Sequence, residues 1–296
     1  MIIVKLNGGI GNQMFQYALG RKLALKGNSV LKFDIDELVV TPPGRVTPRQ
    51  YALHVFDIQA GIADKSEIEK LKCRIDNIIS KNLKKLGFFK RSNSFAPEPH
   101  FHFYPKVLDF EDNIYVTGYW QTEKYFKDIE GVLRKDFSLK KEFGIANKEL
   151  AGEIRSNNAV SLHVRRDDYV TDPIISTYHG VCSLEYYRHA VEYIAAKVKN
   201  PVFYFFSDDM GWVKEHLRIH YPVKYVSDGI LKDYEEMMLM SYCRHNIIAN
   251  SSFSWWGAWL NANPGKIVIA PRPWFVNSLM DTSDVIPEEW TTFSIS

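Results

Sequence analysis

The sequence predicts an α/β protein made of two similar domains, each built on a parallel sheet. Short apolar strands alternate with helical segments along all 296 residues, and this alternation restarts near residue 150. A glycine-rich turn joins the first strand to the first helix, which is how parallel α/β sheets commonly open. About 100–200 residues form one domain, so the length suits two. We expect domains over residues 1–150 and 151–296.

The N-terminal half begins with an apolar strand over residues 2–6, followed by the polar turn Asn7-Gly8-Gly9-Ile10-Gly11-Asn12-Gln13. A helical pattern runs from about residue 14 to 26 and ends at Gly27-Asn28, where the chain turns into a second strand over residues 30–33. The later segments predict a charged amphipathic helix (64–86), an irregular stretch (93–105), a strand (115–120) and a helix from about Thr122.

The C-terminal half repeats the strand and helix alternation. Its apolar runs predict strands over residues 159–164, 202–206, 223–226, 247–249 and 266–270. The intervening segments predict helices over residues 184–198 and 232–243, and a further helix that runs through Trp259.

Composition limits the possible functions and compartments. Lysine and arginine number 37 and aspartate and glutamate 35, so no global field marks a nucleic-acid-binding protein. Cys73, Cys182 and Cys243 are far apart, which indicates a reducing compartment and neither a disulfide framework nor a metal site. The N-terminus reads as a strand rather than a signal peptide, and no apolar run reaches the ~18 residues of a membrane span. We expect a cytoplasmic protein.

Four polar clusters follow predicted strands, at residues 8–13, 163–169, 207–209 and 250–254. Open α/β sheets bind ligands beyond the carboxyl ends of their strands, so this coincidence predicts a ligand site.

The first cluster offers backbone N–H groups at a helix N-terminus, which suits an anion. Gly9-Ile10-Gly11-Asn12-Gln13-Met14 lacks the third glycine of a dinucleotide fingerprint, although Asp34 stands where a ribose-binding acid would be. An NAD site therefore stays open, and so does a plain tight turn that needs a positive φ.

In the second cluster, the two-residue period of a strand places His163 and Arg165 on one face and Arg166 on the other. An arginine fork binds a diphosphate through paired hydrogen bonds. We expect Arg166 to anchor the turn through Asp167 or Asp168. The alternative is a structural network of ion pairs.

The other clusters carry hydroxyl and carboxylate groups. Ser207, Asp208 and Asp209 suit ribose hydroxyls or a divalent metal, although Asp209 in a first helical turn also complements the helix dipole. Asn250, Ser251 and Ser252 suit a ligand or an ordinary N-cap.

Two helices adjoin these clusters. Asp233, Glu235 and Glu236 lead the first turn of the helix over 232–243, where acids also complement the dipole. Trp255, Trp256 and Trp259 follow the last cluster and read as core or interdomain packing.

Together these blocks resemble the α-1,2-fucosyltransferases of glycosyltransferase family 11. The likeness covers nearly the whole chain and rests on the segments 8–17, 118–126, 163–169, His179-Gly180 and 247–259. The family usually has glycine between Arg166 and Asp168, where this chain has Asp167, so a negative charge stands near the expected diphosphate.

The resemblance implies transfer of L-fucose from GDP-β-L-fucose to the 2-hydroxyl of a terminal β-galactose, with inversion. It implies a GT-B type fold of two Rossmann-like domains facing an interdomain cleft, with the acceptor on the N-terminal domain and GDP-fucose on the C-terminal one. It also implies that no metal or other cofactor is needed, which sets aside the metal interpretation of Asp208 and Asp209.

More distant α-1,6- and protein O-fucosyltransferases share the His-x-Arg-Arg-x-Asp element. Their pattern implies Arg165 on the β-phosphate, His163 near guanine or its ribose, and Glu236 as an acid for guanine. The predicted catalytic residues are Arg165, Asp168 and His179. The predicted donor-binding residues are Gly9, Asn12, Gln13, His163, Arg165, Ser207, Asp208, Glu236, Asn250, Ser251, Ser252 and Phe253.

In such a reaction Arg165 and the N–H groups at residues 9–12 and 251–253 would stabilise the departing GDP. The candidates for a base are Asp168, Asp172, His179 and His54, and the sequence does not choose among them.

Two other function classes were weighed: an NAD-dependent oxidoreductase, from Gly9, Gly11 and Asp34, and a non-catalytic carbohydrate-binding protein, from the 14% aromatic content. Residues 81–91 carry five basic residues and no acid among leucine and phenylalanine. Such a segment usually forms a solvated helix face. The hypothesis beside it is peripheral contact with the inner face of a membrane, where a lipid-linked glycan would be the acceptor.

Overall fold

The computed structural model describes residues 1–39, 49–72, 94–277 and 279–295 and divides the chain into two compact units, Met1–Lys140 and Lys141–Ser296. The division falls before the expected boundary at residue 150. The physical reason is α6 (Ile145–Ser156), whose buried Ala151 and Ile154 pack into a core of the second unit. The basic segment 81–91 lies outside the described residues.

The first unit contains a five-stranded sheet in which all the paired strands are parallel. From edge to edge its strands are β3 (Gly61–Ile62), β2 (Leu31–Asp34), β1 (Ile2–Lys5), β5 (Ile114–Thr117) and β4 (Phe95–Pro97). The central strand β1 is fully apolar where it is buried, as expected for a strand covered on both faces. The chain runs outward from β1 to β3, crosses to the opposite edge as β4 and then forms β5 between β4 and β1. The strand order therefore reverses between β1 and β5.

Helices cover this first sheet on both faces. On one side α1 (Ile10–Lys26) lies so close that a Cβ at Gly20 would come within 2.6 Å of Val4. On the other side α3 (Lys65–Lys72) buries Ile68 and Leu71 against Ile3 and Tyr115. The remaining helical segments among the described residues of this unit are α2 (Asp36–Val39), α5 (Glu130–Asp136), η1 (Leu53–Val55), η2 (Pro105–Asp109), η3 (Glu123–Tyr125) and η4 (Lys127–Ile129).

The second unit contains a six-stranded sheet whose paired strands are also all parallel. Its order is β11 (Thr291–Ser294), β10 (Val268–Arg272), β9 (His245–Ile247), β6 (Asn158–Val164), β7 (Pro201–Ser207) and β8 (Val223–Tyr225). The chain runs outward from β6 to β8 and then returns to β9 on the other side of β6. The strand order therefore reverses between β6 and β9.

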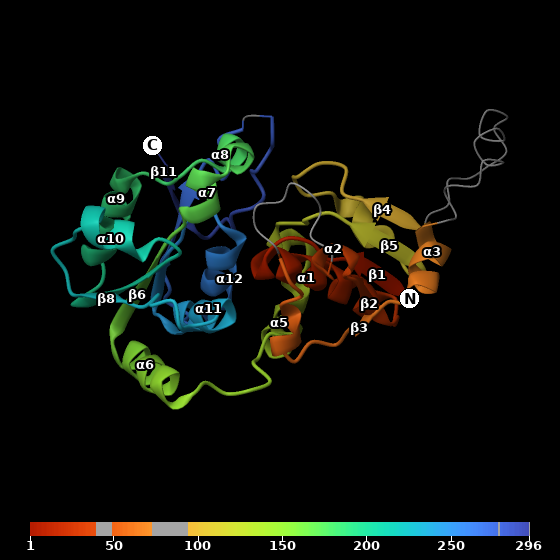
Figure 1. Cartoon of the computed structure of the whole chain (residues 1–296), viewed down its shortest axis with the longest axis horizontal. Coiled ribbons are helices and arrows are strands. Elements are labelled where there is room, and N and C mark those ends of the chain that lie inside the picture. Colours follow the sequence, from red (N-terminus) through yellow and green to blue (C-terminus); the bar gives the residue numbers. More distant parts are fainter. Residues whose placement is uncertain (40–48, 73–93, 278, 296) are drawn as a thin grey trace. The chain divides into compact units, whose positions relative to one another are not determined.

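Two apolar layers enclose the second sheet, whose helices Figure 1 labels. One layer packs Val160 and Leu162 against α9 (Leu184–Ala195) and α10 (Met210–His216). The other packs Tyr204 and Phe206 against α6 and α11 (Asp233–Tyr242). Because helices cover both faces, the ends of the strands are where polar side chains collect. The unit also contains α7 (Asp167–Thr171), α8 (Pro173–His179) and α12 (Ser252–Leu260).

The structure differs from the predicted elements in a few places. α1 begins at Ile10 rather than at residue 14, so the polar residues Gly11, Asn12 and Gln13 form its first turn. The stretch expected to be irregular contains β4, and the helix expected from Thr122 is broken into η3, η4 and α5. Trp255, Trp256 and Trp259 are buried in the second unit, where the Trp255 indole donates to the Val285 carbonyl at 2.8 Å. Within the described part of the chain, no helix is both long and apolar enough to cross a bilayer.

Candidate active site

The carboxyl edge of the second sheet brings three of the predicted clusters together. β6 ends just before Arg165, its neighbour β7 ends at Ser207, and its other neighbour β9 leads into Asn250. Ligands of doubly wound sheets bind where the strand order reverses, which here is the crevice between β6 and β9.

Arg165 lies at the centre of this edge between two carboxylates. Its guanidinium contacts Asp168 at 2.5 Å and Asp208 at 2.9 Å. Burial alone would lower the pKa of Arg165, but the charges of Asp208 and Asp168 outweigh it and raise the pKa above its ordinary value. A guanidinium has five N–H donors, so the two ion pairs fix its plane and leave donors for a ligand.

Arg166 does not contact Asp167 or Asp168, contrary to the prediction. Its Nε lies 3.3 Å from Asp209, and its guanidinium stacks over Trp212, with 3.8 Å to the ring centroid. Asp209 also caps α10 by accepting the Trp212 N–H at 3.1 Å. The prediction was wrong because the true partner comes from the next strand, which the parallel pairing of β6 with β7 brings alongside.

Asp208 joins the two arginines. Besides its contact with Arg165 it accepts the backbone N–H of Arg166 at 2.9 Å. Burial raises the pKa of Asp208, and the charge of Arg165 opposes that rise.

Ser227 connects Ser207 with Glu236. Its hydroxyl accepts the Ser207 N–H at 3.0 Å and hydrogen-bonds the Glu236 side chain. Glu236 lies in the first turn of α11, and burial raises its pKa to about 7, with further contributions from Asp233, Asp228 and Asp208. A carboxyl group with this pKa changes its charge in the physiological range.

His163 is a neutral, buried imidazole at the end of β6. Burial, assisted by the positive charge of Arg165, lowers its pKa to about 3. Its ring lies beside Phe253, with 5.4 Å between centroids. The Nδ1 atom is buried and has no hydrogen-bond partner among the residues that the structure describes.

Asn250 holds the segment that carries His179. Its side-chain amide donates to the carbonyls of His179 at 2.8 Å and Gly180 at 3.2 Å. The backbone carbonyl of Asn250 accepts the Tyr169 hydroxyl at 3.0 Å. The His179 ring packs between Tyr169 and Phe275, at 4.5 and 4.6 Å. Burial lowers the pKa of His179 to about 4, so its imidazole is neutral at pH 7.

Ser251 is the N-cap of α12, and its hydroxyl accepts the Phe253 N–H at 3.3 Å. Ser252 and Phe253 form the first turn of this helix. The N-cap alternative is thus correct for the Ser251 side chain, while the helix N-terminus remains at the same sheet edge as Arg165.

The four candidates for a base differ in their surroundings. Asp168 is buried against Arg165, and Asp172 accepts the Ile175 N–H at 3.2 Å. His179 has a lowered pKa. His54 belongs to η1 of the first unit, is exposed, and has its Nδ1 3.0 Å from the Tyr51 carbonyl. The two acids are thus held by structural contacts.

At the carboxyl edge of the first sheet, Gly8, Asn12 and Gln13 form a hydrogen-bonded turn. Gly8 has φ +72°, and a Cβ there would come within 2.4 Å of the Asn12 side chain, so the tight-turn interpretation holds. The Gln13 side chain is fully buried, donates to the carbonyls of Gly8 and Gln50, and accepts the Ala52 N–H, each at 2.9 Å. The Asn12 side chain accepts from Gln121 at 2.8 Å.

Asp34, the residue that kept an NAD site open, is enclosed by its own unit. It accepts the Tyr115 hydroxyl at 2.6 Å and the Lys72 ammonium at 2.9 Å. Burial would raise the pKa of Asp34, but these partners together lower it. Its carboxylate is therefore a structural anion.

Glu98 was not singled out in the sequence. It follows β4, accepts the backbone N–H groups of Tyr119 and Trp120 at 2.7 and 2.9 Å, and has its pKa raised to about 7, chiefly by burial. The sequence signal was Pro97-Glu98-Pro99, a carboxylate in a rigid segment at a strand end.

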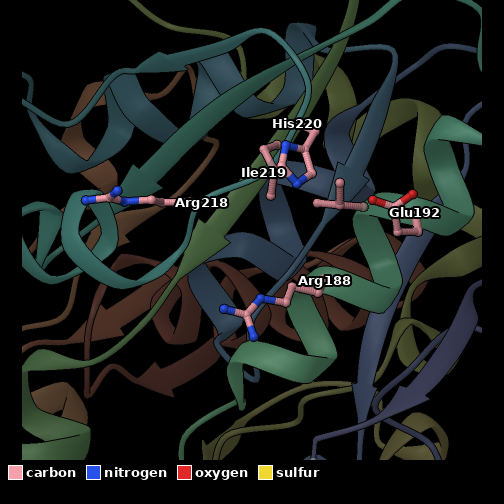
Figure 2. A pocket seen from close by; sticks show the side chains of 6 residues that line it. Arg188, Glu192, Arg218, Ile219 and His220 are labelled. Atoms are coloured by element: carbon pink, nitrogen blue, oxygen red, sulfur yellow. The ribbon is translucent and has the colours of Figure 1, made fainter.

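The clusters above, which lie within the described part of the chain, contain no group of metal-ligating side chains and do not line the pocket beside α9. Over the described residues, no group of three or more His, Cys, Asp or Glu side chains is arranged to hold a metal ion. A pocket of about 270 Å³ lies between α9 and the segment 218–220 (Figure 2). Its lining includes Arg188, Glu192 and Arg218, none of them predicted site residues, and the segment 218–220 precedes β8, at the end of the strand opposite the carboxyl edge.

Comparison with known proteins defines the class. The model of glycosyl transferase family 11 matches residues 71–294, so the chain belongs to that family. It is a glycosyltransferase, and the NAD-dependent oxidoreductase and the non-catalytic binding protein are set aside.

The curated relatives add detail. The chain is 34% identical over 300 residues to an alpha-1,2-colitosyltransferase of Escherichia coli, covering 98% of each chain. It is 33% identical over 308 residues to the O-antigen biosynthesis glycosyltransferase WbnK of Escherichia coli, covering 96% of this chain and 98% of the relative. Human galactoside alpha-(1,2)-fucosyltransferase 1 matches at 25% over 155 residues, 49% of this chain and 42% of the relative.

Solved structures show the same fold. NodZ alpha-1,6-fucosyltransferase soaked with GDP-fucose matches with a TM-score of 0.51 and 14% identity, covering 89% of this chain and 96% of NodZ. A mutant of Arabidopsis thaliana FUT1 in complex with GDP matches with a TM-score of 0.54 and 10% identity, covering 90% and 69%. The expected GT-B type fold, an α/β architecture with two parallel sheets, is confirmed.

Proposed function

We propose that this glycosyltransferase is an inverting α-1,2-fucosyltransferase that moves L-fucose from GDP-β-L-fucose to the 2-hydroxyl of a terminal β-galactose. The observation that carries the proposal is Arg165, which follows β6, the strand that borders the β6/β9 crevice, and is held between Asp168 and Asp208. A fixed guanidinium at a topological switch point suits the diphosphate of a nucleotide sugar.

In this reaction the acceptor oxygen forms a bond to the anomeric carbon of fucose while the bond from that carbon to the β-phosphate oxygen breaks. Negative charge gathers on the departing GDP, and the acceptor hydroxyl gives its proton to a base or to solvent water. The Arg165 donors and the N–H groups at the start of α12 stabilise that charge, and one such preorganised donor is worth about 3–4 kcal/mol. We keep Asp168 as the residue that orients Arg165.

Glu236 and His163 are assigned to the nucleoside. Guanine presents an N1–H and an amino group side by side, and an ionised carboxylate accepts both. Glu236 supplies that carboxylate, and its pKa of about 7 makes binding sensitive to pH. The unpartnered Nδ1 of neutral His163 supports a contact with guanine or its ribose. Ser207, Asn250, Ser251, Ser252 and Phe253 complete the donor subsite.

The first unit is proposed to bind the acceptor. The contacts of Gln13 within its own unit give it a structural role in place of the donor contact first expected. We further propose that the reaction needs no metal. A cytoplasmic enzyme that touches the inner face of a membrane through residues 81–91 and acts on a lipid-linked glycan fits the basic character of that segment.

A second donor deserves a direct test, because the alpha-1,2-colitosyltransferase matches over the full length. Colitose is fucose without its 3-hydroxyl group, so both GDP-sugars present the same diphosphate to Arg165. The fucosyltransferase and colitosyltransferase assignments differ only in whether the donor sugar that binds carries the 3-hydroxyl group.

The test is a donor and acceptor panel with the purified chain. GDP-fucose and GDP-colitose are each paired with lactose, N-acetyllactosamine and lacto-N-biose, and products are identified by NMR. Fucose in an α-1,2 linkage to galactose is the expected product. A chain that transfers colitose and leaves GDP-fucose unused contradicts the fucosyltransferase assignment and supports the second candidate.

A further inference from the structure

A tight turn at the carboxyl end of β5, the strand that borders the switch point of the first sheet, positions the carboxylate of Glu98. Residues 118–120 follow β5, and Glu98 follows the neighbouring β4, with its own N–H donating to the Thr117 carbonyl at 2.8 Å. The Gln16 side chain fixes the turn from α1 by donating to the Gly118 carbonyl at 3.0 Å. This group of residues adjoins the β1/β5 crevice, where a doubly wound sheet binds its ligand.

The backbone of this turn adopts unusual φ angles at Gly118 and Trp120, close to Glu98. Gly118 has φ +150°, and a Cβ there would come within 2.3 Å of the Glu98 Cβ. Trp120, a fully buried and bulky residue, has φ +58°, a conformation that such residues rarely adopt. Its indole Nε1 is buried and finds no hydrogen-bond partner in the described part of the chain. The turn thereby aims the N–H groups of Tyr119 and Trp120 at the two oxygens of Glu98.

The chemistry at this turn suits an uncharged sugar. Each carboxylate oxygen of Glu98 accepts one N–H group, and carboxylate oxygens have further lone pairs that accept from hydroxyl groups. Tyr119 is 38% exposed, and its ring offers a flat apolar surface beside that carboxylate. No ion pair to Glu98 occurs among the described residues, in contrast to the acids around Arg165. A negatively charged ligand would be repelled here.

We propose that Glu98 and Tyr119 form the subsite for the acceptor sugar on the first unit, with the carboxylate accepting sugar hydroxyls and the tyrosine ring lying against the pyranose. The subsite rests on the proposed function for the direction of transfer, but sugar binding can be measured without any donor. Both residues are assigned to binding.

The experiment uses the full chain and two substitutions, Tyr119→Ala and Glu98→Gln. Tyr119→Ala keeps the backbone N–H that bonds Glu98, so it removes the ring while leaving the turn intact. Glu98→Gln replaces one acceptor by an amide that faces an N–H donor, and it can disturb the turn. The matched controls are Tyr225→Ala, on a tyrosine that is 43% exposed on β8, and Glu69→Gln, on an exposed glutamate of α3.

Binding is followed by saturation-transfer NMR with lactose, N-acetyllactosamine and lacto-N-biose in the absence of donor, and by the KM for the acceptor that turns over. We expect both site variants to lose the sugar signal and to raise the acceptor KM at least about tenfold, with GDP affinity unchanged. The controls should match the wild type. Tyr119→Ala with wild-type sugar binding overturns the subsite, as does a wild type that binds none of the three sugars.

The outcomes also separate this subsite from the proposed function. A wild type that binds a sugar through Tyr119 but transfers no fucose would contradict the donor assignment and leave the subsite standing. Normal fucose transfer by Tyr119→Ala, with unchanged acceptor KM, would contradict the subsite and leave the proposed function standing.

Discussion

The carboxyl edges of the two sheets occupy the same topological position and carry opposite kinds of chemistry. At the carboxyl edge of the second sheet, beyond β6 and β7, Arg165 and Arg166 are paired with Asp168, Asp208 and Asp209. At the β1/β5 edge, amides pair with amides and carbonyls: Gln16 with Asn7 and Gly118, and Gln121 with Asn12. An arginine in an ion pair can also bind the anionic group of a ligand. Amides that already pair with amides and carbonyls offer such a ligand no charge.

Under the proposed function, this difference assigns a different task to each of the two sheet edges. A charged edge is suited to a diphosphate because its arginine is already oriented and its acids tune the local charge. The edge built from amides contains the Glu98 carboxylate, which has no ion pair among the described residues and is held by backbone N–H groups. The following predictions test that contrast, from the largest expected effect to the smallest.

The charged edge should fail most severely when Arg165 is replaced by lysine. Lysine keeps the charge but cannot reproduce the planar guanidinium that contacts both Asp168 and Asp208. A lost hydrogen-bond donor matters most in the transition state, where the charge on the leaving GDP is greatest. We therefore expect kcat to fall about a hundredfold, which corresponds to an activation barrier higher by about 3 kcal/mol, with a smaller rise in the KM for GDP-fucose.

Arg166→Lys is the matched control, since Arg166 contacts Asp209 and Trp212 instead. Its kcat should fall much less. If Arg165→Lys retains wild-type kcat while Arg166→Lys is inactive, the two roles must be exchanged.

The edge built from amides should lose stability rather than activity. Gln13→Ala removes three hydrogen bonds of a fully buried side chain and leaves the Ala52 N–H without its acceptor. We expect a loss of about 2–3 kcal/mol and a Tm lower by roughly 5–10 °C. GDP affinity should change less than about threefold, because that loss falls below 1 kcal/mol.

Differential scanning calorimetry and GDP titration measure both quantities. Gln59→Ala, on an exposed glutamine of the same unit, is the control and should leave Tm unchanged. A large loss of GDP affinity in Gln13→Ala at unchanged Tm would return Gln13 to the donor site.

The pH dependence of GDP binding tests Glu236. Burial and the nearby Asp228, Asp233 and Asp208 raise its pKa to about 7, while Ser227 lowers it. The ionised form accepts the guanine N–H groups, so affinity should be full at pH 8 and should fall below pH 7, approaching about tenfold per pH unit. Calorimetric titration at several pH values measures this slope.

Glu236→Gln should bind more weakly at pH 8 and lose the part of the slope that belongs to this carboxyl group. Ionisation of GDP itself is common to both proteins and cancels in the comparison. Equal slopes for wild type and variant would remove Glu236 from the guanine subsite.

Chelation should have the smallest effect. If Arg165 and the α12 N-terminus stabilise the departing diphosphate, excess EDTA should change kcat by less than about twofold. That limit corresponds to a change of less than about 0.5 kcal/mol in the activation free energy. Complete loss of activity that Mn²⁺ restores would give Asp208 and Asp209 a metal-binding role.

Much of this architecture could be predicted because apolar runs and the polar clusters that end them are local signals. The strands that carry His163, Ser207 and Asn250 were found in this way, and the parallel sheet places their ends side by side. Pairings across strands could not be predicted. Nothing near Arg166 in the sequence points to Asp209, which the neighbouring strand supplies.

Other differences also have physical causes. β4 was missed because Pro97 and Pro99 mask a short strand, and Glu98 was missed with it. The boundary expected at residue 150 lies C-terminal to the observed division after Lys140. The sequence of an amphipathic helix does not show which sheet the helix covers, and α6 packs on the second sheet. α7 and α8 were not predicted, since two aspartates and a proline dominate their sequence.

The strand orders have a consequence for synthesis on the ribosome. The first sheet can close once β5, at Ile114–Thr117, has emerged. The second cannot, because β6 must wait for β9 at His245–Ile247, and Ser183 at the start of α9 is bonded to Ile295 beyond the final strand. Domains fold from the N-terminal side as they appear, and distant pairings form slowly. The nascent chain therefore carries a folded first unit well before the second sheet can form.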